Sequence, residues 1–94
     1  MSKREKLRQK LRQQPADASM QDVETLLLRF GFILSRVRGS HHIFDFDDGK
    51  HIQQLIVPLH GRRVKKFYVE QVVIVLDDLF PIEVETEDDN GKDD

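Results

Sequence analysis

Two adjacent histidines, His41 and His42, have the side chains best suited to proton-transfer chemistry in this sequence. An imidazole with an unperturbed pKa of about 6.5 exists in both acid and base forms at neutral pH, so it can take or give a proton. The pair follows Gly39-Ser40 and lies between two hydrophobic runs, which is typical of a tight β-hairpin. The elements around this hairpin decide which of the two histidines is available for chemistry.

Alternating apolar and polar residues predict three strands, at about 32–38, 41–47 and 51–59. Gly39-Ser40 and Asp48-Gly49 are expected to join them as two-residue turns. With both turns of that length, Arg38 pairs with His41, Val37 with His42, Asp47 with Lys50, and Phe44 with Gln53.

Because successive side chains of a strand point to opposite sides, this register predicts two faces. The core face collects Ile33, Val37, His42, Phe44, Phe46, Leu55 and Val57. The polar face collects Arg36, Arg38, His41, Asp45, Asp47, Lys50 and Gln54. His41 is therefore expected on the polar side beside two arginines, and His42 on the core side.

Two helices are expected to cover the sheet. Ser19, followed at the third position by Asp22, resembles a capping box, and an apolar stripe at helical spacing then runs to Gly31, so a helix is expected at about 20–30. A broader apolar stripe predicts a second helix at about 64–79, ending near Pro81. The predicted fold is α+β: helix, three-stranded antiparallel sheet, helix.

The ends of the chain carry opposite charges, although the formal net charge is only −2. Residues 1–14 carry six basic residues and one acid, and residues 83–94 carry seven acids and one lysine. We expect residues 1–18 to form a basic, weakly helical and partly frayed arm, residues 19–81 the folded domain, and residues 82–94 a disordered acidic tail. An acidic excess confined to a tail does not argue against nucleic-acid binding.

Composition narrows the possible functions. The chain has no cysteine, which excludes disulfides and thiolate metal sites. No apolar stretch approaches the roughly 20 residues that span a bilayer, so a cytoplasmic protein without membrane contact is expected. Asp45, Asp47 and Asp48 are assigned to a turn and a solvated strand edge, and the histidines lack zinc spacing, so no metal or cofactor is expected.

Basic residues cluster before and at the start of the last predicted helix: Arg62, Arg63, Lys65 and Lys66. A helix N-terminus attracts anions, so these cations, together with Arg36 and Arg38, are candidates to bind an RNA backbone. A basic solvated turn is the alternative. His60 fits two roles equally, either a second proton-transfer group or phosphate ligand, or a structural cap of the loop; His51 is expected to be an ordinary surface residue.

An ordered set of short motifs resembles the HicA family of toxin components of toxin–antitoxin systems. The set is Gly31-Phe32, Gly39-Ser40-His41, Phe44, Val57-Pro58, His60-Gly61 and Lys65 or Lys66. The resemblance implies a fold similar to the double-stranded-RNA-binding domain, cleavage of mRNA, and inhibition by a HicB-like antitoxin. The family's catalytic histidine follows Gly-Ser, which is His41 here.

The leading hypothesis is therefore an RNA-cleaving toxin that needs no metal, with His41 as the proton-transfer residue. A non-catalytic RNA-binding module on the same scaffold is the main alternative, and a protein-interaction domain with an occluded histidine face is a third.

Overall fold

The computed structural model describes residues 2–81, so the predicted acidic tail lies outside the described residues. The elements are α1 (Lys3–Gln13), a 3₁₀ turn (Pro15–Asp17), α2 (Met20–Arg29), β1 (Ile33–Arg38), β2 (His41–Asp47), β3 (Ile52–Pro58) and α3 (Lys66–Leu79). The strands form one antiparallel sheet in the order β1-β2-β3. The α+β fold expected from the sequence is confirmed, and its arrangement is consistent with a fold similar to the double-stranded-RNA-binding domain.

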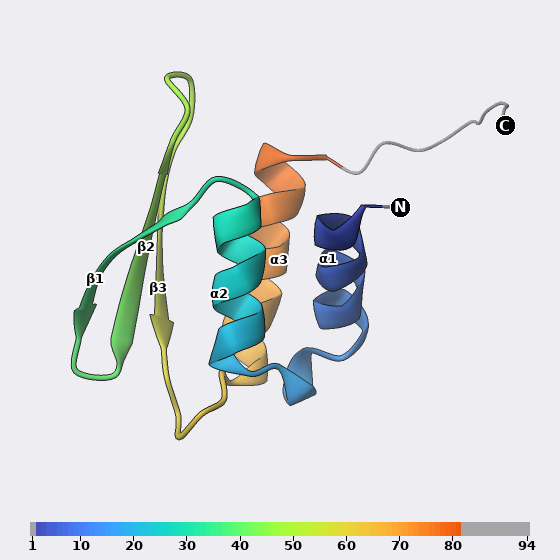
Figure 1. Ribbon diagram of the computed structural model, residues 1–94, viewed down its shortest axis with the longest axis vertical. Helices are drawn as coiled ribbons and strands as arrows, with labels where there is room; N and C mark the ends of the chain where they lie inside the picture. The colour runs from blue at the N-terminus through green and yellow to red at the C-terminus, as the bar shows by residue number, and fades with distance from the viewer. Residues whose placement is uncertain (1, 82–94) are drawn as a thin grey trace, which may run out of the picture.

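Figure 1 shows the layers: the sheet lies on one side, α2 and α3 pack beside it, and α1 lies on the side of these helices away from the sheet. The core forms between the sheet and the helices, where the side chains of Phe44 and Val57 meet those of Leu26, Val69 and Leu76 in one buried cluster. These helices do not cover the opposite face of the sheet. The polar side chains of the strands therefore point away from the helices.

Helix α2 begins and ends as its sequence predicts. The Asp22 backbone N–H donates to the Ser19 hydroxyl at 3.1 Å, which satisfies one of the free donors of the first turn. The helix ends before Gly31, whose φ of 98° lies in the left-handed region that glycine adopts without strain. The Phe32 side chain that follows is buried.

The two hairpin turns differ in length. Arg38 pairs with His41 and Val37 with His42, so the two-residue turn at Gly39-Ser40 is confirmed. The two-residue turn at Asp48-Gly49 is wrong, because Asp47 pairs with Ile52 and Phe44 with Leu55, which leaves four residues in the loop.

Side-chain hydrogen bonds explain the longer loop. The Lys50 and His51 backbone N–H groups donate to the Asp48 carboxylate at 2.9 and 2.7 Å. These bonds, that of His51 first, hold the pKa of Asp48 below its ordinary value. Because the register changes by two residues, every β3 side chain keeps its expected face, although Lys50 belongs to the loop and not to the polar strand face.

A β-bulge in β1 corrects the expected position of Ile33. Leu34 pairs with Phe44 but Arg36 pairs with Ile43, so Ser35 is an extra residue in β1. Ile33 therefore lies opposite Asp45 and is 61% exposed, and Leu34 takes its place beside the core. Val37 lies on the expected face beside His42 but is half exposed, because it is near the end of the hairpin.

The interpretation of the N-terminal segment as a solvated, frayed arm is wrong. Leu11 of α1 is 1% exposed and belongs to the common core, and Leu7 packs against that core. Arg8 is also 1% exposed, although arginine is rarely buried without partners. Helix α1 is an integral element of the fold.

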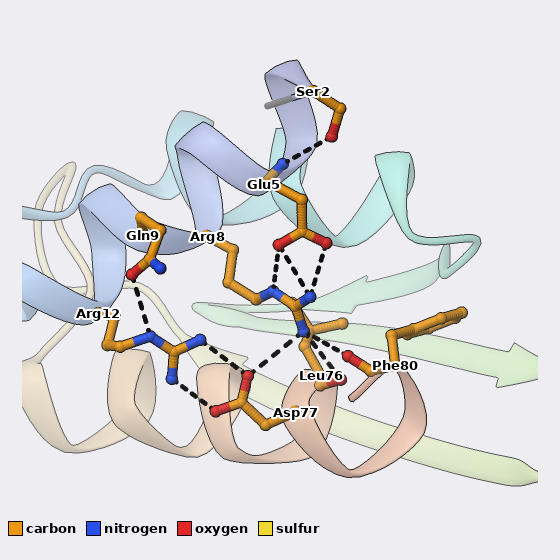
Figure 2. A network of polar contacts seen from close by, with 8 residues as sticks. All are labelled: Ser2, Glu5, Arg8, Gln9, Arg12, Leu76, Asp77 and Phe80. Carbon is orange, nitrogen blue, oxygen red and sulfur yellow. Dashed lines mark hydrogen bonds and ion pairs between the residues drawn. The ribbon is translucent and has the colours of Figure 1, made fainter. Parts of the chain in front are cut away.

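Figure 2 shows how the buried Arg8 guanidinium is satisfied. It donates to the Glu5 carboxylate at 2.7 to 3.0 Å, to the main-chain carbonyls of Leu76 and Phe80 at 3.2 and 2.7 Å, and to Asp77 at 3.3 Å. It also lies 4.8 Å from the centre of the Phe30 ring. Helix α3 has no basic residue in its own last turn, so Arg8 supplies the cation that its carbonyl end favours.

We expect Arg8→Ala to lower the free energy of unfolding by about 3 kcal/mol, because it takes the guanidinium donor away from the Phe80 carbonyl and the Glu5 carboxylate and removes one of the two arginines that join α1 to α3. Urea denaturation followed by circular dichroism measures the change. Lys6→Ala, on the exposed side of the same helix, is the matched control and should change stability by less than about 0.5 kcal/mol. Equal stabilities for the two variants would contradict a stabilising role of the network.

Asp77 should make stability depend on pH. The Arg12 guanidinium donates to the Asp77 carboxylate at 2.6 and 2.9 Å and, with the nearby charge of Arg8, lowers the pKa of that carboxyl. A lowered pKa means that the stabilisation is present above the unfolded-state value of about 3.9 and is lost as pH falls through the folded-state value.

Asp77→Asn should therefore be less stable than the wild type at pH 7, by about 1 to 3 kcal/mol, with the difference shrinking below about pH 4. Denaturation at a series of pH values measures it. Asp78→Asn removes an exposed neighbouring carboxylate that forms no ion pair within residues 2–81 and is the control. A difference for Asp77→Asn that stayed constant down to pH 2.5 would refute the charged pairing.

Candidate functional site

His41 is the first residue of β2 and its side chain is exposed on the sheet face away from the helices. It lies directly between Arg38 of β1 and Pro58 of β3, with each pair of Cα atoms about 5 Å apart as is usual for cross-strand partners. Arg36 lies on the same face, one row further along the sheet. The sheet thus holds an exposed imidazole next to two exposed guanidinium groups.

His42 points to the opposite face, as the register predicts. It pairs with Val37 and Val57, is half-buried, and its Nδ1 atom is buried without a hydrogen-bond partner among residues 2–81. The sequence-based separation of the two histidines is confirmed.

Isoleucines share the outer face with His41, which the sequence reasoning missed. Ile43 lies between Arg36 and Ile56, and it is only 6% exposed although it is outside the core cluster. Ile33 and Ile52 extend this apolar strip toward the other hairpin tip, where Ile52 is 83% exposed. Side chains alternate between the two faces along β2 and β3, so applying this rule to Ile43, Ile52 and Ile56 would have placed them on the face of His41.

The basic segment after β3 is held in place by backbone hydrogen bonds. His60 and Arg63 exchange N–H···O bonds of 2.8 and 3.0 Å around a tight turn, with Gly61 at a φ of 66°. The Met20 N–H donates to the Arg62 carbonyl at 3.1 Å, so the turn is fixed to the start of α2. His60, Arg62, Arg63, Lys65 and Lys66 all have exposed side chains.

The start of α3 leaves backbone donors available. Lys65 is its N-cap without a side-chain cap, Lys66 is its first residue, and no acidic residue occupies the first turn. A hydrogen bond of 2.7 Å from the Leu59 N–H to the Ser40 carbonyl ties the end of β3 to the hairpin turn next to His41.

The predicted site residues come from two places at one end of the molecule. Arg36, Arg38 and His41 share the outer sheet face, whereas the cations from Arg62 to Lys66 belong to the β3–α3 connection. In Figure 1 the β1–β2 turn, the end of β3 and the start of α3 all lie at the lower end. His51 lies at the opposite hairpin tip, 3.5 Å from Asp48, which fits its expected surface role.

Two further features of residues 2–81 bear on the site. They contain no group of three or more His, Asp or Glu residues placed to hold a metal ion. None of the helices they form combines the length and apolarity that crossing a membrane requires.

Comparison with known proteins identifies the family of this chain. A family model described as the HicA toxin of bacterial toxin–antitoxin systems matches residues 20–77, from the start of α2 nearly to the end of α3. The chain belongs to the HicA toxin family. Membership implies a cognate antitoxin as partner, and α1 lies outside the matched HicA region. No curated protein and no solved structure gave a match.

The two histidines of this HicA chain should respond differently to substitution. His42→Leu removes a buried nitrogen that has no hydrogen-bond partner in the part of the chain that the structure describes, so stability should stay the same or rise by about 1 kcal/mol. His41→Ala removes an exposed ring and should change stability by less than about 0.5 kcal/mol. Thermal and urea unfolding of both variants provides the check, and a loss of more than 1 kcal/mol in His42→Leu would show that its ring makes a stabilising bond.

Proposed function

We propose that this chain is a metal-independent mRNA endoribonuclease, the toxin component whose activity a HicB-like antitoxin restrains. The observation that carries the proposal is the position of His41, exposed on the sheet face and directly beside Arg38. Membership of the HicA family supports it. So does the Gly39-Ser40-His41 motif, which resembles the family's motif with its catalytic histidine.

His41 acts as the base in this proposal. It takes the proton of a ribose 2′-hydroxyl, whose oxygen then attacks the adjacent phosphorus and displaces the 5′-oxygen of the next nucleotide. The bond to the 5′-oxygen breaks as the 2′-oxygen bond forms, so the products are a 2′,3′-cyclic phosphate and a free 5′-hydroxyl. A second group must protonate the leaving oxygen, and His60 is our candidate because it follows, by two residues, the Pro58 that pairs with His41.

The cations hold the phosphate. The Arg38 and Arg36 guanidinium groups can donate to phosphate oxygens on the face where His41 acts, and such donors stabilise charge that develops in the transition state. Arg62, Arg63, Lys65 and Lys66, with the free N–H groups at the start of α3, bind the neighbouring backbone. The isoleucine strip that includes Ile43 provides an apolar surface next to the reacting groups.

The test is cleavage of a labelled single-stranded RNA by the purified protein in chelator. Wild type should cleave it, and His41→Ala should cleave at least about 100-fold more slowly, since positioned acid–base groups contribute about 10²- to 10⁴-fold. His51→Ala is the matched control, because it removes another exposed histidine, in the β2–β3 loop at the other end of β2 from His41, and should keep full activity. A DNA of the same sequence should stay intact, because it lacks the 2′-hydroxyl.

Equal cleavage by wild type and His41→Ala would refute the role of His41. Absence of cleavage by the wild type, with RNA binding that weakens as salt rises and survives His41→Ala, would favour the alternative of a non-catalytic RNA-binding module.

A further inference from the structure

A shallow groove of about 400 Å³ runs between α1 and α2, on the helical side of the molecule. Four cations line it, Lys3, Lys6 and Lys10 from α1 and Arg29 from the end of α2. Asp22 is the only acid among the described residues that line the groove, and its carboxylate lies 3.2 Å from the Lys10 ammonium. Four positive charges against one negative leave the groove with three unbalanced positive charges.

These unbalanced charges are not neutralised elsewhere in the described part of the chain. Within residues 2–81, no ion pair involves Lys3, Lys6 or Arg29. Arg8 and Arg12 of the same helix are instead committed to Asp77 and, for Arg8, to Glu5. The helix therefore uses one set of cations to attach itself and presents another set to solvent.

Polar side chains continue the groove along the outer side of α1. An adjoining depression, also of about 400 Å³, shares Lys6 and Lys10 and is otherwise lined by the amides of Gln9, Gln13 and Gln14. Amide and ammonium groups are the side chains that commonly contact phosphates and sugars. Among the described residues that line the two hollows, Leu7 alone has a hydrocarbon side chain, and the large aromatic side chains that anchor many protein–protein interfaces are not found there.

We infer that this α1–α2 groove is a second RNA-binding surface, which holds the phosphate backbone of a strand away from His41. An extended polyanion fits better than a small anion, because Lys3 and Lys10 are seven residues apart, about 10 Å along the helix. The network around Arg8 fixes α1 in advance, so binding costs little ordering of the backbone. The choice of RNA as the polyanion rests on the proposed function, whereas the groove and its charge do not.

Helix α1, which supplies three of the four groove cations, is not part of the region that the HicA family model matches, whereas Arg29 is. Helix α1 lies outside the matched residues 20–77, and it packs on the helices on the side away from the sheet that carries His41. RNA bound there would contact the protein at a position separate from the proposed cleavage site.

The experiment measures binding of a labelled 20-nucleotide single-stranded RNA by fluorescence anisotropy, using the full chain with His41→Ala in chelator. The test variant adds Lys6→Gln and Arg29→Gln, which remove two groove cations. The control adds Lys50→Gln and Gln71→Glu, which change the net charge by the same −2 at exposed positions on the hairpin tip and α3. We expect the test variant to bind at least 10-fold more weakly at 50 mM salt, and the control within twofold of its parent.

The salt dependence gives a second measure. Loss of two phosphate contacts should reduce the slope of log affinity against log salt by about 1.4, at about 0.7 per contact with a single strand. Equal affinities and slopes for the test and control variants would overturn the inference. Displacement of the RNA by polyglutamate at the same charge concentration would also overturn it, because it would point to an acidic protein segment as the occupant.

Failure of the proposed function would look different. If the wild type did not cleave RNA while the groove variant still lost affinity relative to its control, the second surface would stand and the cleavage proposal would fail. If the wild type cleaved and the groove variant bound as the control does, only the second surface would be refuted.

Discussion

The two-residue turn at Gly39-Ser40 is the constraint on which the arrangement of the candidate site depends. It places Arg38 opposite His41, and the alternation of side chains along β2 then sends His41 to the open face and His42 toward the helices. A slip of one residue would exchange the two rings. The Ser40 carbonyl also accepts the Leu59 N–H, so the same turn fixes the end of β3 and the start of the basic segment. Backbone geometry therefore positions the imidazole.

The opposite side of the molecule depends on a buried charge. A guanidinium removed from water costs several kcal/mol unless its donors are satisfied, and Arg8 meets this condition with a carboxylate on its own helix and two carbonyls near the end of α3. Phe30, beneath Arg8, packs in turn against Phe80 with the ring centres 5.1 Å apart. One side chain thus joins α1, the end of α2 and the end of α3, and it does so where α3 lacks a cation of its own.

Local patterns were enough to predict the central elements and the separation of the two histidines, because caps, turns and strand alternation act over a few residues. What they missed depends on other interactions. The bulge at Ser35 inserts a residue without any mark in the hydrophobic pattern, and so moved Ile33 to the outer face. The Asp48 carboxylate lengthened the second turn by accepting two backbone N–H groups. The burial of Arg8 requires acceptors 68 and 72 residues away, and α1 itself shows little more than two leucines to suggest packing.

The two cationic surfaces differ in the side chains that lie next to their cations, and these neighbours decide which chemistry each surface can support. On the sheet face, arginines stand beside an exposed imidazole and an apolar strip, so a phosphate held there meets a proton-transfer group. In the α1–α2 groove the polar neighbours of the lysines are amides, a threonine and one aspartate, and no imidazole is among the described residues that line it. In our proposal that groove adds affinity and directs a strand, whereas cleavage takes place at His41. The region matched by the family thus carries the candidate chemistry, and α1, which lies outside it, adds both core packing through Leu11 and three cations of the second surface.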